Sequence, residues 1–363
     1  MNANFDLSAL AFEAAFPGNK VLFDDKGLPS FMVRIPKMTY AQLGLGDSTD
    51  VFPAFIVNDQ TVDEIYISKY QNVVQDGRAY SLPGRDPKTS ITFDNALKAC
   101  TDKGAGWHLM TAFEWGALIA WCENNGFIPI GNNTFGRHVT ENVYKAIPAT
   151  KDADHFAVHT RTGTGPLEWF HDKTPAGIAD LCGNVWEWTG GMRTVYGELQ
   201  ILTNNNAANG SHAQTAASAE WKAIDATTGE LITPDGTGTT SNSIKMDYVA
   251  SKLTYDIAIS ASQGADGADT QFGCQFTAIT HNSDNVSEAA VKVLQAIGMY
   301  PKAGTILDIA HNMCYWRPFQ AERSFARGGN YSNSAYGFAS FSGNGPRSSA
   351  NVGIGFRSAY VKL

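Results

Sequence analysis

The sequence predicts a domain of the α+β class. Helical patterns come early in the chain, strands and turns dominate later, and no regular alternation of strand and helix occurs. Hydrophobic residues make up 43% of the chain and charged residues 17%, a balance that suits a packed core and excludes wholesale disorder. The 363 residues are enough for one large domain or two ordinary ones.

Residues 1–60 are predicted to form a small N-terminal element used for attachment or oligomerisation. Short apolar runs at residues 31–35 and 51–57 are punctuated by Gly, Pro and Asp, which indicates a few strands. Residues 64–70 then alternate between apolar and polar side chains, as in a half-buried strand. We therefore place the start of the main domain, residues 61–363, at this strand.

Three helices are predicted from the signals at their ends. Thr92 begins the first, and the apolar residues after it recur at helical spacing. Thr111 and Glu114 have the spacing of a capping box at the start of the second. The third begins at Ser287 and ends with Gly298 as the residue that follows its C-cap.

Between about residues 195 and 285 the composition shifts to Ala, Thr, Ser, Gly and Asn. Residues 204–210 are typical of a long polar loop, and residues 223–232 of a hairpin. We interpret residues 195–285 as an inserted subdomain that decorates the main domain.

Charge and targeting signals exclude several classes of protein. The net charge of −8 and the absence of any run rich in Lys and Arg argue against a nucleic-acid partner. The N-terminus lacks the basic and apolar regions of a Sec signal, and no apolar stretch is long enough to span a membrane. We therefore expect synthesis in the cytoplasm and, for any role outside the cell, release by another route such as lysis.

The chain has five cysteines, which is an odd number, and none of them forms a C-x-x-C pair. This excludes a disulfide framework or a zinc ribbon and predicts buried, reduced thiols.

The most informative segment lies between Asn330 and Gly353. Of its 24 residues, 16 are Ser, Gly, Asn or Tyr, and Arg347 carries the only charge. Tyr and Phe supply rigid contact area, while Ser, Gly and Asn supply adaptable hydrogen bonds, as in antibody binding loops. An ordinary polar surface loop has the same composition, so this observation needs support from the rest of the chain.

That support comes from five motifs in a fixed order. They are the strand at 65–70, Ile-Thr-Phe-Asp-Asn-Ala at 91–96, the Trp-His-Leu-Met-Thr segment at 107–115, Gly-Asn-Val-Trp-Glu-Trp within 180–189, and Arg-Gly-Gly at 327–329 followed by Gly-Phe-Arg at 355–357. With these motifs the chain resembles the C-type-lectin-like domain of the formylglycine-generating-enzyme (sulfatase-modifying factor) family. The resemblance covers residues 61–363 apart from the insertion, and it implies a C-type-lectin-like fold of the formylglycine-generating-enzyme subclass.

The family has an oxidase branch, which binds copper through two cysteines shortly after Arg-Gly-Gly. Here those positions fall on Asn333 and on Gly337 or Phe338, and no cysteine follows Cys314. Asn and Gly cannot replace the soft thiolate ligands of Cu(I). We therefore expect that the chain is not an enzyme, and a metal-dependent oxidase is the disfavoured alternative.

The family also has a binding branch, the variable proteins of diversity-generating retroelements, found in phage tails and on some bacterial surfaces. In these proteins the C-terminal segment, here 327–357, is rewritten by adenine-directed mutagenesis. The resemblance implies a hypervariable face that binds a protein or another cell-surface ligand, in a phage tail or, second, on a cell surface. A homo-oligomer, for example a trimer, would suit such a setting. A static structural virion protein is a further alternative.

The predicted binding residues are spread over the variable segment. They are Tyr331, Ser332, Asn333, Tyr336, Phe338, Ser340, Phe341, Ser342, Asn344, Arg347, Ser349 and Asn351. Strand alternation should turn about a third of them inward. Phe338 and Phe341 are as well suited to the core as to the surface.

The resemblance also implies a structural calcium site in the hallmark loop. The ligands carried over from the family are Asp180, Gly183, Val185 and Glu187, and oxygen atoms from a tight loop are what Ca²⁺ prefers. The alternative is that polar residues of this loop only hydrogen-bond the turn while Trp186 and Trp188 fill the core. Both interpretations stay open from the sequence, and no cofactor is required for the predicted function.

Overall fold

A computed structural model describes residues 3–151, 153, 157–260, 264–265 and 267–363. The smaller of its two main sheets joins the two ends of the chain. Its strand order is β1 (Asn19–Phe23), β2 (Pro29–Pro36), β5 (Glu64–Ser68), β23 (Ser358–Tyr360) and β8 (Trp107–Leu109). Because β23 pairs with both β5 and β8, the last strand of the chain closes the sheet that the N-terminal strands begin.

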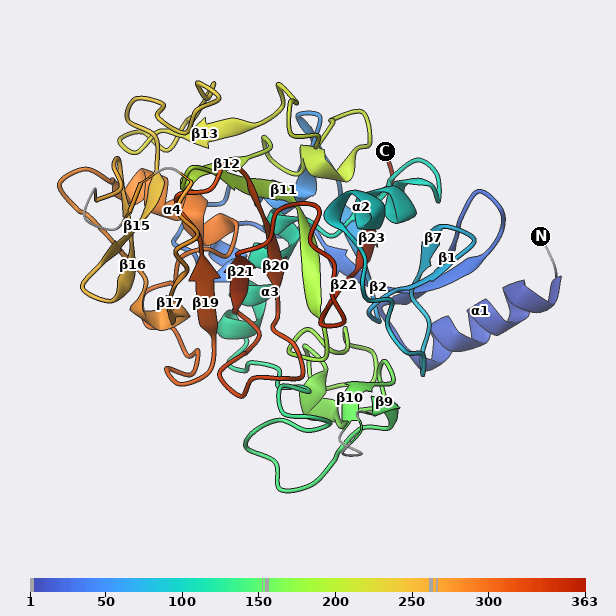
Figure 1. Ribbon diagram of the computed structural model, residues 1–363. Helices are drawn as coiled ribbons and strands as arrows, with labels where there is room; N and C mark the ends of the chain where they lie inside the picture. Colours follow the sequence, from blue (N-terminus) through green and yellow to red (C-terminus); the bar gives the residue numbers. More distant parts are fainter. Residues whose placement is uncertain (1–2, 152, 154–156, 261–263, 266) are drawn as a thin grey trace.

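The larger sheet contains the C-terminal segment at its centre. Its main path is β17 (Phe272–Gln275), β19 (Met313–Trp316), β21 (Phe341–Gly343), β20 (Arg323–Arg327), β11 (Trp186–Val195), β12 (Glu198–Ile201), β15 (Lys245–Val249), β16 (Lys252–Asp256) and β18 (Thr280–His281). Strand β13 (Lys222–Ile224) joins β12 to β14 (Leu231–Ile232), and β22 (Ile354–Phe356) pairs with β11. Figure 1 shows β19, β21 and β20 side by side, with β11 next to β20 and β22 on the other side of β11.

Three two-stranded hairpins complete the strands of the described residues. They are β3 (Ile56–Val57) with β4 (Gln60–Thr61), β6 (Val73–Gln75) with β7 (Arg78–Tyr80), and β9 (Pro148–Lys151) with β10 (Ala157–Thr160). Short 3-10 helices occur at Ala41–Leu43, Pro53–Phe55, Leu167–Trp169, Asn206–Ala208 and Phe276–Ala278.

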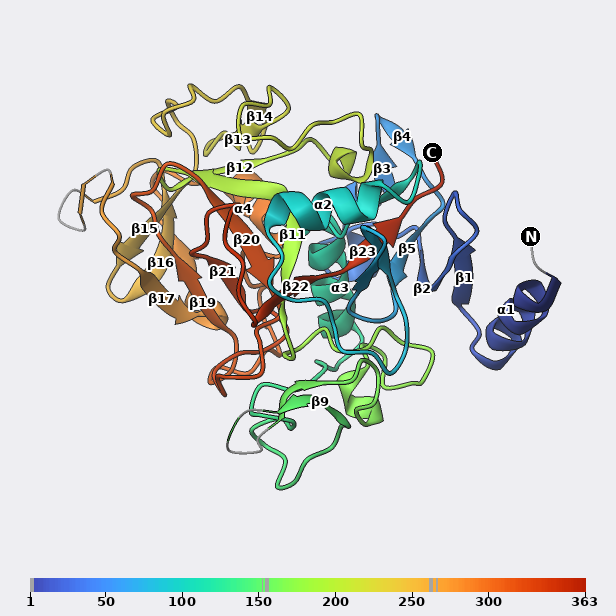
Figure 2. The ribbon, with the colours of Figure 1, turned by 45° about the vertical axis from the view of Figure 1, so that its right-hand side comes forward.

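All three helices predicted from the sequence are confirmed. Helix α2 (Phe93–Thr101) is capped by Thr92, and α3 (Ala112–Asn124) begins with the capping box of Thr111 and Glu114. Helix α4 (Glu288–Ala296) is capped by Ser287, and Gly298 follows its C-cap with a φ of 64°. Helix α3 is buried along most of its length, and Figure 2 shows it in the middle of the molecule, between the two sheets.

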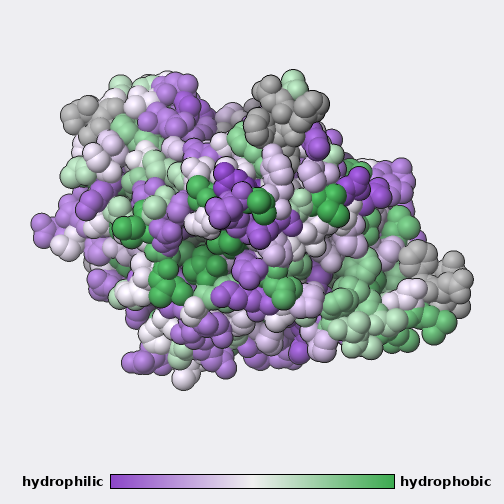
Figure 3. All heavy atoms as spheres, turned by 90° about the horizontal axis from the view of Figure 1, so that it is seen from below, coloured by the Kyte–Doolittle hydropathy of each residue, from purple (hydrophilic) through white to green (hydrophobic). Residues whose placement is uncertain are grey.

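The N-terminal element differs from the prediction. Helix α1 (Ala3–Ala15) was not expected, and the predicted strand at residues 51–57 is mostly wrong, since Pro53–Phe55 form a 3-10 helix. Phe12 of α1 packs edge-on against Phe31, with ring centroids 4.5 Å apart, whereas Leu7 and Leu10 are 68% and 63% exposed. Helix α1 therefore projects from the body at the right of Figure 1, and exposed hydrophobic residues lie on this side of the molecule in Figure 3.

Strands from the predicted insertion, residues 195–285, form part of the larger sheet. The hairpin predicted at residues 223–232 is confirmed as β13 and β14, and β15 to β17 extend the sheet. The predicted polar loop at 204–210 is largely internal, because Asn205 is buried and its amide hydrogen-bonds Ala54 and Glu114. The division at residue 60 and the insertion boundaries stay predictions. Among the described residues, no helix is long and apolar enough to cross a membrane.

Candidate ligand-binding pocket

Strand β11 builds the floor of a pocket in the larger sheet. Successive residues of a strand face opposite sides, so Trp186 and Trp188 lie on one face and Glu187 on the other. Trp188 is paired with Ala326 of β20, and Trp186 with Ile354 of β22. These four side chains form the aromatic and apolar base of the pocket.

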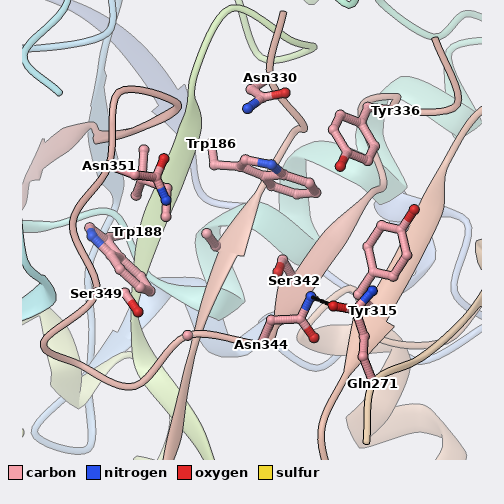
Figure 4. Close-up of a pocket in the computed structure, with 13 residues that line it drawn as sticks. Trp186, Trp188, Gln271, Tyr315, Asn330, Tyr336, Ser342, Asn344, Ser349 and Asn351 are labelled. Carbon is pink, nitrogen blue, oxygen red and sulfur yellow. Dashed lines mark hydrogen bonds between the residues drawn. The ribbon is translucent and has the colours of Figure 1, made fainter. Parts of the chain in front are cut away.

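The pocket has a volume of about 410 Å³. We define it by the residues that line it: Trp186, Trp188, Gln271, Tyr315, Ala326, Asn330, Tyr336, Ser342, Asn344, Gly345, Ser349, Asn351 and Ile354. Figure 4 shows the labelled polar and aromatic side chains around a central space, with Trp186 and Ser342 near the middle.

Five predicted binding residues line this pocket, namely Tyr336, Ser342, Asn344, Ser349 and Asn351. The alternation of side chains along strand β21 explains in part which predicted residues line the pocket. Its residues Phe341 and Gly343 are buried, whereas Ser342 between them faces the pocket. The chain after β21 then curves around the floor and brings Asn344, Ser349 and Asn351 to the rim (Figure 4).

Three predicted binding residues are wrong, because the structure buries them completely. Phe338 packs against Trp115 at a ring-centroid distance of 5.9 Å, and Phe341 packs against Phe325 at the same distance. Ser340 has no exposed surface, and its hydroxyl accepts a hydrogen bond from the backbone N–H of Gly337. Strand alternation and the tight turn before β21 therefore assign these residues to the core.

Arg347 has a different role from the predicted ligand contact. Its guanidinium forms a two-pronged ion pair with Glu322, at 2.8 and 3.1 Å, and a further one with Asp94 at 2.6 Å. It also donates to the carbonyl of Gln214. These bonds tie the segment 330–353 to α2 and to the insertion, and they compensate the only charge in that segment.

The remaining predicted residues lie on a loop beside the pocket. Ser332 is exposed, and the side-chain oxygen of Asn333 accepts from the backbone of Ala335. The ring of Tyr331 lies 5.6 Å from that of Phe135 and 5.4 Å from that of His159. These three residues do not line the pocket, although they extend the same C-terminal surface.

Sequence reasoning missed several pocket residues. Trp186 and Trp188 were considered only as core residues in one of two open alternatives, which describes their burial but not the face they offer to the pocket. Gln271 comes from the insertion, and Tyr315 from β19. Nothing in the local sequence of Gln271 marks it, since its position depends on β17 pairing with β19.

No residue that lines the pocket carries a formal charge. The rings of Trp186 and Tyr336 meet at 61° with centroids 4.8 Å apart, and those of Tyr336 and Tyr315 at 89° and 6.2 Å. Burial raises the pKa of both tyrosines above the ordinary value of 10. Both phenols therefore stay neutral at physiological pH and keep their hydroxyl hydrogens for bonding.

The opposite face of β11 holds a buried polar cage. Gln71 lies three residues after the end of β5, and its Nε2 is 3.0 Å from Oε1 of Glu187. The same nitrogen lies 3.2, 3.3 and 3.2 Å from the carbonyl oxygens of Asp180, Gly183 and Val185. The predicted calcium ligands therefore converge on one point, and the Gln71 amide occupies it.

Neighbouring bonds fix the orientation of this amide. The backbone N–H of Thr160 donates to Oδ1 of Asn184, which leaves Nδ2 of Asn184 to donate to Oε1 of Gln71 at 2.9 Å. Nε2 of Gln71 must then face the oxygens. Glu187 is also bound by both prongs of Arg357 at 2.9 Å, so its charge is already compensated. The side chain of Asp180 points elsewhere, to the N–H of Gly163. These residues do not fit a bound calcium ion.

The five cysteines are all buried free thiols. Cys274 and Cys314 face each other across β17 and β19. Burial raises the pKa of both thiols, so they remain protonated at neutral pH and are poor ligands for copper. Asn333 and Gly337, at the positions of the family's copper cysteines, belong to the loop beside the pocket.

The mixed helices and sheets, with a C-terminal strand that returns to pair with β5, define a C-type-lectin-like domain. The sequence model of the family described as Sulfatase-modifying factor enzyme 1-like domain matches residues 24–234, more than half of the 363 residues. The chain belongs to this family. The match begins within the predicted N-terminal element and ends before the variable segment.

Several solved structures resemble the chain at low identity. PvdO from Pseudomonas aeruginosa is 12% identical, with 95% of this chain and 98% of that chain covered and a TM-score of 0.35. Treponema denticola variable protein 1 is 11% identical, with 95% and 99% covered and a TM-score of 0.31. The Major Tropism Determinant P3c variant is 10% identical, with 94% and 71% covered and a TM-score of 0.29. No curated protein matches the chain by sequence.

Proposed function

We propose that this protein binds a ligand through a diversified C-terminal face and performs no catalysis. One observation carries the proposal: seven residues of the Ser, Gly, Asn and Tyr-rich segment, five of them predicted to bind, line a single pocket whose floor is the hallmark strand β11. A rigid floor lets the rim residues change without refolding the domain, which is what a variable binding protein needs.

The proposed setting is a phage tail or another displayed surface, where the pocket contacts a protein or other ligand of the target cell. Helix α1, with Leu7 and Leu10 exposed, supplies the surface for attachment to a particle or for self-association. The segment from 327 to 357 is proposed to be rewritten by a retroelement.

Sequencing many copies of the 3′ end of the gene from its native population tests this proposal. Differences should concentrate at the codons of Tyr336, Ser342, Asn344, Ser349 and Asn351, and a near-copy of codons 327–357 should lie in neighbouring DNA. The buried Phe338 and Phe341 should stay constant, as should codons 183–188. Equal conservation of the rim and of codons 183–188 would overturn diversification and favour a static structural role.

The oxidase alternative requires thiolate ligands beside an open site. Purified protein loaded with Cu(I) and supplied with a cysteine-containing peptide should consume no oxygen, because Cys274 and Cys314 are buried and protonated. Copper-dependent oxygen uptake would revive this alternative.

A further inference from the structure

The shape of the pocket indicates the size of its ligand. A volume of about 410 Å³ lies in the usual range for small-molecule sites, about 300–1,000 Å³. Protein–protein interfaces instead bury roughly 800 Å² on each partner. The pocket is hollowed between the chain after β21 and the floor of β11, so it suits a compact group that inserts.

The electrostatics indicate that this group is uncharged. All residues lining the pocket are neutral, and the nearby Arg347 is occupied by Glu322 and Asp94. A charged ligand would lose hydration on entering without meeting an opposite charge, which is unfavourable.

The polar groups indicate a ligand with many hydroxyls. Four amides, Asn330, Asn344, Asn351 and Gln271, and two hydroxyls, Ser342 and Ser349, surround the aromatic floor. The side-chain oxygens of Asn330, Asn351 and Gln271 already accept bonds within the protein. Their NH₂ groups remain as donors for ligand hydroxyls. The angled faces of Trp186, Tyr336 and Tyr315 offer flat apolar surface for the C–H side of a ring.

Asn344 supplies the most specific sign of a missing partner. Arg317 can only donate, and it contacts Oε1 of Gln271 at 3.4 Å, which orients that amide. Nδ2 of Asn344 then donates to the same Oε1 at 2.9 Å (Figure 4). Oδ1 of Asn344 is buried and has no hydrogen-bond partner in the described part of the chain. A buried acceptor of this kind is stabilised by a ligand hydroxyl that donates to it.

We propose that the pocket binds a neutral saccharide unit of one or two rings. The sugar ring packs on the aromatic corner, and one of its hydroxyls donates to Asn344. This inference rests on the proposed binding function and specifies its ligand class. A neutral peptide segment is the competing ligand and is an outcome of the test below.

The test measures binding of the labelled protein to a printed panel of neutral and acidic glycans, with affinities from titration of the intrinsic tryptophan fluorescence. We expect binding to a subset of neutral glycans. Ser342→Trp fills the pocket and should abolish binding, and Asn344→Leu should weaken it about tenfold, as for one buried hydrogen bond. Ser211→Trp, at an exposed serine of the insertion that does not line the pocket, is the matched control and should bind like the parent. Thermal melts verify that each variant is folded.

Binding to acidic glycans alone, or neutral binding that survives Ser342→Trp, overturns the ligand class. A glycan panel without hits also overturns the ligand class. Binding to cells from the native community then separates the proposed ligand class from the proposed binding function. Cell binding that survives periodate oxidation of glycans, is removed by protease and is lost in Ser342→Trp identifies a protein ligand and leaves the binding function standing. Absence of cell binding together with an invariant gene segment refutes the binding function as well.

Discussion

Replacing Gln71 tests whether its side-chain amide stabilises the loop that the family resemblance predicts to bind Ca²⁺. The side chain is fully buried, and its Nε2 has two hydrogens for four nearby oxygens, so it makes about two full hydrogen bonds at a time. Its Oε1 accepts a third bond, from Asn184. Gln71→Leu keeps a similar volume and removes all three.

The magnitude follows from the kinds of bond lost. A hydrogen bond to a carboxylate contributes about 1.5–3 kcal/mol, and a neutral one about 0.5–1.5 kcal/mol. Asn184 keeps its bond to the carbonyl of Thr160, so part of the loss is offset. We expect the free energy of unfolding to fall by about 3 kcal/mol. At roughly 2 °C per kcal/mol for a large domain, Tm should fall by about 6 °C.

Thermal and urea unfolding measure this loss. The same substitution at Gln75, which is exposed in β6, is the control and should change stability by less than about 0.5 kcal/mol. A Gln71→Leu protein as stable as the parent would show that the Gln71 hydrogen bonds contribute nothing to the free energy of unfolding.

The calcium arm of the experiment compares the parent protein in EDTA and in millimolar Ca²⁺. If the Gln71 amide occupies the cage, the Tm of the parent protein should be the same in EDTA and in Ca²⁺, within about 1 °C. A bound ion at a hundred times its Kd would add about 2.7 kcal/mol. A calcium-dependent rise of several degrees, abolished with the cage residues, would refute the reasoning and restore the calcium site that the family resemblance implies.

Two further predictions concern buried charge and pH. Arg327 donates to the carbonyls of Ile297 and Gly298 at the C-terminal end of α4, so Arg327→Met should lower stability by about 2–4 kcal/mol, measured by urea unfolding. Arg34→Met at the surface is its control, and equal effects of the two would contradict a specific role in capping α4. Burial lowers the pKa of His171 from 6.5 to about 4, and its Nδ1 accepts from the N–H of Ile178. The folded pKa lies below the unfolded one, so its stabilisation is present above pH 6.5 and is lost as the pH falls through 4. His171→Asn keeps an acceptor without titrating and should flatten urea midpoints between pH 6.5 and 4; parallel curves for parent and variant would contradict this.

The predictable parts of the fold are those that local chemistry decides. Thr111 and Glu114 specify the start of α3 within four residues, and Ser287 does the same for α4. Helix α1 was missed although Ala, Leu and Glu favour helices, because its apolar residues do not form a distinct stripe at helical spacing. Residues 204–210 look polar enough for a surface loop, and only distant contacts of Asn205 explain their burial.

Composition pointed to the segment that lines the pocket, but it did not identify which of its side chains face the pocket. Arg327 pairs with Phe341 and Ala326 with Ser342, and this register decides which residues face the pocket. A shift by one residue would exchange the two sets, and the sequence contains no signal that excludes it. Gln71 was missed for a similar reason, since the loop that surrounds it lies more than a hundred residues later.

Strand β11 separates the surface that we propose to be variable from a fixed core. Its Trp186 and Trp188 face the pocket, while Glu187 between them is held by Gln71 and Arg357. The bonds on the second face contain no residue of the rim, so substitutions at Ser342, Asn344 or Ser349 leave them intact. Arg357 comes directly after β22 and thus anchors the end of the variable segment to the same cage. Substitutions in the rim therefore leave the bonds that hold β11 and the end of β22 in place.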